Sequence, residues 1–271
     1  MSGGQLQRVK VGELTATLLP VGEISDDVGD WFPADADLAP KGVSRLPVNC
    51  LHIGGPGISV LVDACDPGLY PRTGQPVEPL GDALEGAGIH PEHVTHVILT
   101  HGHHDHFCGV AGPDGKPCFP AARHILSGGD WANGTLTADA QMADGRAADP
   151  TALEMLFKRG LLDIGQSAVP LPSQITLTDA PGETAGHRVV RLSSGGVVLY
   201  FLADLFHLQA EIKDPTLCPL WADKTTLMES RRRLISAICR DGARFLCSHT
   251  AEIFSADIFT RYAPLTREAS K

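Results

Sequence analysis

Several features that mark other classes of protein are missing from this sequence of 271 residues. No run approaches the ~18 consecutive apolar residues that a membrane-spanning helix needs, so we expect neither a transmembrane segment nor a membrane partner. Residues 1–13 hold no apolar core of signal-peptide length, and we therefore expect a cytoplasmic protein. The seven cysteines are odd in number and form no C-x-x-C pair, which favours reduced thiols over a disulfide framework.

Positive charge is scarce as well. The chain has 22 Lys and Arg against 32 Asp and Glu, a formal net charge of −10. Because proteins bind phosphate backbones mainly through Lys and Arg, this balance argues against a nucleic-acid partner. The one compact basic cluster, residues 231–233, is interpreted as a solvated helix face. With 43% hydrophobic residues and no low-complexity segment, we expect one folded domain over residues 1–271.

Apolar runs with strand character alternate with stretches of helical spacing. Strands are expected at 8–19, 48–53, 58–64, 94–100, 123–126, 174–178, 189–192, 197–202 and 243–247, and helices at 79–87, at 224–240 and within 136–162, broken near 149–150. Residues 25–47 are expected to form a long connection that could overhang a pocket. In each half, strands come first and helices follow. This order predicts an α/β protein of two packed sheets with helices outside, a four-layer αββα sandwich.

The expected strand 94–100 ends at a histidine cluster. Residues 101–106 hold four histidines and one aspartate. Imidazole and carboxylate groups suit zinc, and also iron, manganese or cobalt, whereas calcium would not select histidine. Because residues two apart in an extended segment project in the same direction, His101 and His103 can bind one ion, and Asp105 and His106 can face a second. A surface histidine tract with no specific ligand is the alternative, which the apolar strand before the cluster disfavours.

The run Thr100–His106 resembles the T-H-x-H-x-D-H signature of the metallo-β-lactamase superfamily, and later landmarks of that family occur in order. Pro181–His187 resembles its P-G-H-T-x-G-H motif, with Glu183 at a supporting position in place of the first histidine. Ala203–Leu205 resembles the segment that supplies a metal-bridging aspartate, and Phe245–His249 resembles the segment that ends at the last ligand. The resemblance implies seven metal ligands, namely His101, His103, Asp105, His106, His187, Asp204 and His249.

This ligand set implies two divalent metal ions, with zinc as the leading expectation and iron, manganese or cobalt as alternatives. Asp105 is expected to orient the attacking water or to transfer a proton, besides binding metal. His207 follows Asp204 by three residues, close to where some lactonases of the family use a tyrosine, and is expected to contact substrate or shuttle a proton. Outer partners for the ligand histidines are expected among Asp63, Asp66 and Glu183. For Asp63, an ordinary turn-forming role is equally open.

The resemblance also narrows the range of activities that the family would imply for this chain. Class B β-lactamases lack a bridging aspartate such as Asp204, and the flavodiiron branch has glutamate where this chain has His103. The stretch from Ala203 to His249 looks most like the branch of lactonases and methyl-parathion-hydrolase-like enzymes. We therefore predict a dinuclear metal-dependent hydrolase that uses a metal-bridging hydroxide on a small-molecule lactone or related ester, with N-acyl-homoserine lactone as the leading substrate.

Alternatives remain open at this stage. The enzyme alternatives are phosphotriester (organophosphate) and acyl-thioester hydrolysis, and the alternative of another class is a non-hydrolytic, metal-dependent small-molecule binding protein. A set of apolar side chains could line an acyl pocket or simply pack in the core: Trp31, Phe32, Phe107, Leu217 and Trp221. A homodimer is expected from the resemblance alone.

Overall fold

The first strands of the chain form a long β-ribbon. The computed structural model describes residues 6–35, 37–38, 40–65, 80–112, 114–132, 151–165 and 170–259. One strand was expected over residues 8–19, but β1 (Gln7–Val11) and β2 (Leu14–Asp27) form a hairpin instead. Its turn contains Gly12, which has a φ of 57° and where a Cβ would lie 2.5 Å from Ser194 Oγ, so only glycine fits. Apolar and β-branched residues continue on both sides of this turn, so the sequence pattern alone predicted a single strand.

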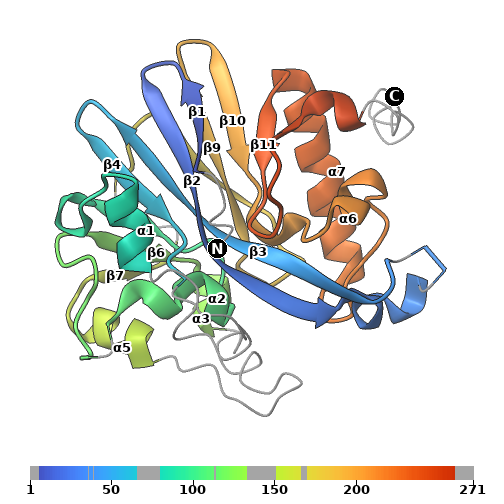
Figure 1. Cartoon of the computed structure of the whole chain (residues 1–271), viewed down its shortest axis with the longest axis horizontal. Helices are drawn as coiled ribbons and strands as arrows, with labels where there is room; N and C mark the ends of the chain where they lie inside the picture. The colour runs from blue at the N-terminus through green and yellow to red at the C-terminus, as the bar shows by residue number, and fades with distance from the viewer. Residues whose placement is uncertain are drawn as a thin grey trace.

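The expected long connection over residues 25–47 is shorter than predicted. β2 continues to Asp27 and β3 (Val43–Gly55) starts at Val43, and these two residues are paired in the antiparallel ladder. Only residues 28–42 join the strands, and they include the 3-10 turns η1 (Val28–Trp31) and η2 (Pro33–Asp35). The ribbon and its tip reach across to α6 on the right of Figure 1.

The described residues form two sheets. The first has seven strands in the order β1 to β7, completed by β4 (Ile58–Val62), β5 (His96–Ile98), β6 (Arg123–Leu126) and β7 (Leu162–Ile164). The second has the order β12-β11-β10-β9-β8, with β8 (Ile175–Asp179), β9 (Arg188–Ser194), β10 (Val197–Phe201), β11 (Arg244–Leu246) and β12 (Phe254–Ser255). Pairing is parallel from β4 to β7 and between β10 and β11. The short strands β7 and β12 were not predicted.

Helices cover the outer faces of the two sheets (Figure 1). The α-helices of the described residues are α1 (Leu80–Gly86), α2 (His104–Phe107), α3 (Gly128–Ala132), α5 (Thr151–Lys158), α6 (Gln209–Lys213) and α7 (Lys224–Asp241). Further 3-10 turns are η3 (Pro91–His93), η4 (Cys108–Val110) and η6 (Ala203–Leu205). The predicted helical region 136–162 contains α5, and its residues 136–150 lie outside the described part. Among the described helices, none is both long enough and apolar enough to cross a lipid bilayer.

Three apolar cores account for the layers. On β4, Val60 and Val62 face the second sheet and pack with residues such as Phe201, whereas Leu61 points outward among residues that include Leu84 of α1. This alternation follows from the two-residue period of a strand. A third core lies between the second sheet and α7. The predicted four-layer αββα sandwich is therefore confirmed.

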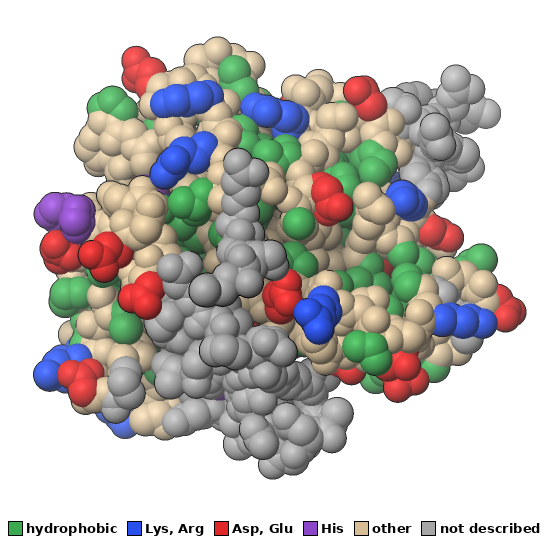
Figure 2. Space-filling view, in the orientation of Figure 1, with side chains coloured by type: hydrophobic (Ala, Val, Ile, Leu, Met, Phe, Trp, Pro, Cys, Tyr) green, Lys and Arg blue, Asp and Glu red, His purple; other side chains and the backbone are tan. Residues whose placement is uncertain are grey.

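Helix α7 corrects one expectation about charge. Arg231 is 1% exposed, although residues 231–233 were predicted to form a solvated face. Leu227, Leu234 and Ile235 are its neighbours at helical spacing and are also buried, so Arg231 lies on the inner face of the helix. On the molecular face drawn in Figure 2, Lys and Arg side chains are dispersed among acidic ones.

Candidate metal centre

The candidate ligands lie where parallel strands end. Asp63 follows β4 and His101 follows β5, while Asp204 follows β10 and His249 follows β11. The backbone is strained at two of these points, because Asp63 has a φ of 59° and Ala203, next to Asp204, has a φ of 48°. Such left-handed conformations in non-glycine residues are typical of functional sites. The C-terminal ends of strands from both sheets thus meet at one place.

Asp204 is the central side chain of the site. Its Oδ2 atom lies 3.7 Å from His101 Nε2, 3.2 Å from His106 Nε2 and 3.3 Å from His249 Nε2. Its Oδ1 atom is buried without a hydrogen-bond partner among the described residues. One carboxylate therefore lies close to three histidines from two segments of the chain, and one of its oxygens has no hydrogen-bond partner among the described residues.

Two groups of side chains are each suited to hold a metal ion. The first is His101, His103, Glu183 and Asp204, and the second is Asp105, His106 and His249; within each group the candidate ligand atoms lie within 4.8 Å of one another. In the first group, His101 Nε2 and His103 Nδ1 are only 2.9 Å apart. In the second, Asp105 Oδ2 lies 3.4 Å from His249 Nε2. Six of the seven predicted ligands are brought together in these groups.

His187 lies beside the first group but outside it. Its ring centroid is 5.1 Å from that of His101. Its Nδ1 donates to the Ala180 carbonyl oxygen at 3.0 Å, and its Nε2 accepts the Asp204 backbone N–H at 3.2 Å. A proton on Nδ1 leaves a lone pair on Nε2, which is the form of histidine that binds metals.

Oxygen acceptors orient His106 and His249 in the same way. His106 Nδ1 donates to Asp63 at 2.8 Å, and His249 Nδ1 donates to the Pro47 carbonyl oxygen at 2.9 Å. Asp63 also accepts the Thr100 N–H at 2.8 Å and the Thr100 hydroxyl at 2.9 Å, so it is more than a turn-forming residue. Metal-binding histidines usually have such partners. Asp66, the other aspartate expected in this role, lies outside the described residues.

Asp130, at the start of α3, was missed by sequence reasoning. Its carboxylate accepts the Gly102 N–H at 2.8 Å, the Thr184 hydroxyl at 3.0 Å and the Gly186 N–H at 2.6 Å. A Cβ at Gly186 would lie 2.7 Å from Asp130, so glycine is required at this close approach. Asp130 thus ties the loop of the first histidine motif to the loop of the second.

His207 faces the site beside two tryptophans. Its Nε2 lies 3.4 Å from Asp204 Oδ2 and 3.4 Å from Glu183 Oε1. The ring centroids of Trp31 and Trp221 are 5.8 Å and 5.6 Å from that of His207, and both tryptophans are partly exposed. The other three apolar candidates, Phe32, Phe107 and Leu217, are fully buried and belong to the core. Trp31 and Trp221 are therefore the two aromatic candidates that can contact a ligand.

A buried ion pair between Glu211 and Arg231 holds the backbone at His207 in place. Glu211 Oε2 accepts the backbone N–H groups of His207 at 2.8 Å and Leu208 at 2.9 Å, and it lies 3.5 Å from His207 Nδ1. The other oxygen of Glu211 is paired with Arg231, whose Nε donates to the Leu205 carbonyl oxygen at 2.8 Å. Sequence reasoning missed this pair, since Arg231 was assigned to the surface.

The directions of the pKa shifts indicate that the buried carboxylates of the site need positive charge beside them. Burial, reinforced by His106, holds the pKa of His101 well below its ordinary value. Burial also opposes a charge on His106, but the carboxylates of Asp204 and Asp105 outweigh it and hold the pKa of His106 well above its ordinary value. Burial opposes a charge on Asp204 as well, yet the nearby imidazoles hold its pKa well below the usual range. Buried carboxylates of this kind need either protons on their neighbours or cations.

The residues fit a pair of metal ions. Asp204 Oδ1 and Glu183 Oε2 are buried polar atoms without a partner in the described part of the chain, and both belong to groups of imidazole and carboxylate donors. First-row divalent ions bind this donor set, and binding would release the histidine protons that now balance the carboxylates.

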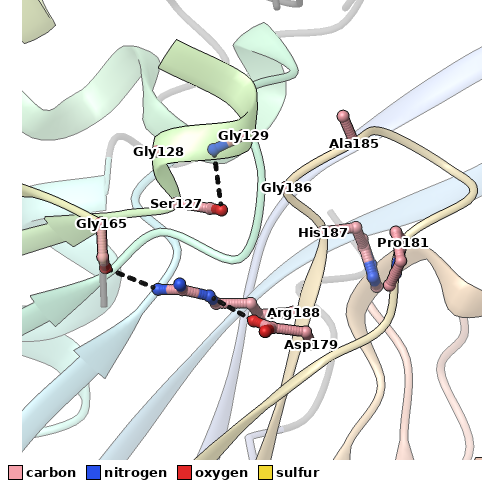
Figure 3. A pocket seen from close by; sticks show the side chains of 10 residues that line it. All are labelled: Ser127, Gly128, Gly129, Gly165, Asp179, Pro181, Ala185, Gly186, His187 and Arg188. Carbon is pink, nitrogen blue, oxygen red and sulfur yellow. Dashed lines mark hydrogen bonds and ion pairs between the residues drawn. The ribbon is translucent and has the colours of Figure 1, made fainter. Parts of the chain in front are cut away.

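A cavity of about 300 Å³ adjoins His187 on the side of β6 and α3. Figure 3 shows Arg188 reaching across it between Asp179 and Gly165. Arg188 Nε donates to Asp179 at 2.9 Å and its Nη1 donates to the Gly165 carbonyl oxygen at 3.3 Å. The guanidinium is thus engaged within the protein, and we assign the cavity no ligand.

Comparison with known proteins establishes the family. Residues 43–237 match the family model described as the metallo-beta-lactamase superfamily. The chain belongs to this superfamily. The predicted family and the predicted fold are therefore confirmed, and both are those of metal-dependent hydrolases. A search of curated protein sequences gives no significant match.

Solved structures with the same fold include two lactonases. AidC, a dizinc quorum-quenching lactonase, is 22% identical with a TM-score of 0.75, covering 90% of each chain. A probable metal-dependent hydrolase from Staphylococcus aureus is 19% identical with a TM-score of 0.73, covering 91% of this chain and 93% of that one. A quorum-quenching N-acyl homoserine lactone lactonase is 18% identical with a TM-score of 0.66, covering 90% and 94%. At these identities the likeness is one of fold.

Proposed function

We propose that this protein is a dinuclear metal-dependent hydrolase of lactones or related esters, with an N-acyl-homoserine lactone as the leading substrate. The observation that carries the proposal is the position of Asp204, whose one carboxylate oxygen lies within 3.7 Å of nitrogens from His101, His106 and His249. A carboxylate shared by two groups of donors is suited to a pair of neighbouring ions.

The proposed ligands divide between two ions. His101, His103 and His187 would hold the first ion, and Asp105, His106 and His249 would hold the second, with Asp204 shared between them. Zinc is the leading candidate, because imidazole-rich sites suit it, and iron, manganese or cobalt are compatible with the same donors. The dizinc description of AidC, which shares the fold, supports this choice.

The chemistry would be addition of water to the ester carbonyl carbon, cleavage of the bond to the ring oxygen, and transfer of a proton to that oxygen. When bound, the two ions would lower the pKa of a water molecule and polarise the carbonyl group of the substrate. Asp105 and His207 are the residues proposed to move or direct protons. His207 Nε2 faces the centre at 3.4 Å from Asp204 Oδ2, within reach of a substrate placed over the metals.

The surroundings of His207 support a substrate with an apolar part. Trp31 and Trp221 contact each other edge to face, with ring centroids 5.2 Å apart, and both flank His207. Partly exposed tryptophans beside polar catalytic groups provide an apolar wall with one hydrogen-bonding end. We propose that this wall receives the acyl chain or the lactone ring.

The test is metal content per chain, measured together with turnover of γ-butyrolactone and of N-acyl-homoserine lactones on the same sample. We expect two ions per chain and lactone turnover, with the longer acyl substrates favoured by higher kcat/KM. Two ions without lactone turnover would retain the metal site and move the search to phosphotriesters and acyl thioesters. Fewer than one ion after reconstitution would contradict the dinuclear centre itself.

Substitution of Asp204 tests whether this residue is the ligand shared by the two ions. Asp204→Ala should lose one ion and most turnover while the far-ultraviolet circular dichroism spectrum stays that of the wild type. Glu154→Ala is the control, because Glu154 is an exposed carboxylate that pairs with Lys158 on α5 and with none of the proposed ligands. Full activity in Asp204→Ala would contradict the shared-carboxylate site.

A further inference from the structure

Glu183 departs from the family motif and lies in the first group of ligand candidates. Its side chain is fully buried, and Oε1 lies 3.4 Å from His103 Nδ1 and 2.6 Å from Trp221 Nε1. The candidate ligand atoms of Glu183, His101, His103 and Asp204 all lie within 4.8 Å of one another. Ligand atoms around a tetrahedral zinc ion, each about 2.0–2.2 Å from it, lie about 3.3–3.6 Å apart. The 3.4 Å between Glu183 Oε1 and His103 Nδ1 falls within that range. The carboxylate is therefore placed where a ligand would be.

The backbone around Glu183 fixes the direction in which its side chain points. Gly182 has a φ of 135°, and a Cβ there would lie 2.4 Å from the backbone of Leu227 in α7. The Gly182 carbonyl oxygen accepts the N–H of Asp223, which caps the start of α7, at 2.8 Å. This turn can form only with glycine before Glu183 and with α7 packed against it. The side chain consequently enters the site from a rigid support.

One oxygen of Glu183 has no partner. Oε2 is buried without a hydrogen bond among the described residues, while Oε1 accepts the Trp221 indole N–H. A buried carboxylate with an unsatisfied oxygen is costly, and a nearby cation would offset that cost. The Trp221 contact has the form of an outer partner that orients a metal-binding carboxylate.

We infer that Glu183 is itself a ligand of the first metal ion, in addition to the ligands proposed above. The inference rests on the proposed dinuclear centre and deepens it. A carboxylate in place of the usual histidine adds a negative charge and a harder oxygen donor to the first ion. This change raises affinity for the first ion and shifts the preference from zinc toward manganese or iron.

The experiment uses the full chain loaded with cobalt(II), whose visible absorption bands respond to the number and kind of ligands. Glu183→Gln should weaken binding of one of the two ions on the order of tenfold or more, measured by chelator competition, and should change the cobalt bands. Glu154→Gln is the matched control, because it makes the same substitution at an exposed carboxylate that pairs with Lys158 on α5. It should retain two ions and the wild-type cobalt bands.

The outcomes separate this inference from the proposed function. If the wild type binds two ions and Glu183→Gln matches it in affinity and spectrum, Glu183 is not a ligand. If the control Glu154→Gln changes both readouts as much as Glu183→Gln does, the loss does not arise at Glu183, and the inference is overturned. A wild type that binds no metal contradicts the dinuclear centre. Should Glu183→Gln fail to fold, Glu183→Asp, which keeps the charge but withdraws it by one methylene, should give the same losses, and wild-type behaviour would overturn the inference.

Discussion

At the scale of single residues, His106, His187 and His249 are each oriented by an oxygen acceptor that lies outside the proposed ligand set. Asp63 is the strongest example, since its carboxylate accepts the His106 ring N–H together with the backbone N–H and the hydroxyl of Thr100. All three contacts are buried, so water does not replace them when one is removed. Asp63 therefore fixes both the tautomer of His106 and the end of β5.

Asp63→Asn is predicted to weaken metal binding by about 10–100-fold. Asparagine keeps the size and tolerates the φ of 59°, but its amide N–H₂ must face a donor in place of one carboxylate oxygen. Chelator competition measures the loss. Asp114→Asn, at an exposed carboxylate paired with Lys116, is the control and should bind metal like the wild type. Equal affinities for the two variants would show that Asp63 does not support the site.

His207→Gln is predicted to lower kcat for the lactone by about 100-fold, the usual contribution of a positioned acid or base, while metal content stays at two ions. Glutamine keeps a hydrogen-bonding end but does not transfer a proton near neutral pH. Steady-state kinetics and metal analysis on one preparation make the test. A rise in KM with kcat unchanged would instead assign His207 to substrate binding alone.

The residues that the sequence made predictable are those of contiguous motifs. His101, His103, Asp105 and His106 lie within six positions, so their grouping needs no knowledge of the fold. Asp130 could not be found in this way, because it is 28 residues from Gly102 and 56 from Gly186, and an isolated aspartate at the start of a short helix has many ordinary roles.

At the scale of elements, α7 and the short α6 are joined by the pair Arg231–Glu211. Both side chains are essentially unexposed, and the Arg231 guanidinium also lies 4.6 Å from the centre of the Phe206 ring. The sequence placed α7 within one residue of its observed bounds, because Asp223 and Gly242 cap it. It misplaced Arg231, since a run of three arginines gives no sign that one of them finds an acceptor inside.

Arg231→Met is predicted to lower the free energy of unfolding by about 3–5 kcal/mol, because it leaves the Glu211 carboxylate buried without its cation. The double variant Arg231→Met/Glu211→Gln should recover much of that loss. Urea denaturation of the wild type, both single variants and the double variant gives the coupling energy. Additive losses in the double variant would contradict the view that the two charges depend on each other.

At the scale of the whole molecule, strands of both sheets end at the same edge of the fold. The pattern of strands and helices was sufficient to predict the layers, because the alternating faces of β4 need apolar neighbours on both sides. It was insufficient for the β1–β2 turn and for β7 and β12, where two or three paired residues depend on a neighbouring strand that the local sequence does not specify.

The interior of the first sheet also predicts how stability depends on pH. His124 on β6 is 0% exposed, and burial lowers its pKa from 6.5 to about 4. An unfolded chain takes up this proton near pH 6.5, whereas the folded chain does so only near pH 4. Between these values the unfolded state binds more protons, so the contribution of His124 to stability is complete above pH 6.5 and is lost as the pH falls.

His124→Leu is therefore predicted to flatten the loss of stability between pH 6.5 and pH 4 by up to about 3 kcal/mol, since one unit of pKa corresponds to about 1.4 kcal/mol. Urea midpoints of chelated wild type and variant, measured at several pH values, isolate this term because the remaining histidines titrate in both proteins. His90→Leu, at an exposed histidine, should keep the wild-type slope. If His124→Leu also keeps it, the burial of His124 is not the source of the acid sensitivity of the fold.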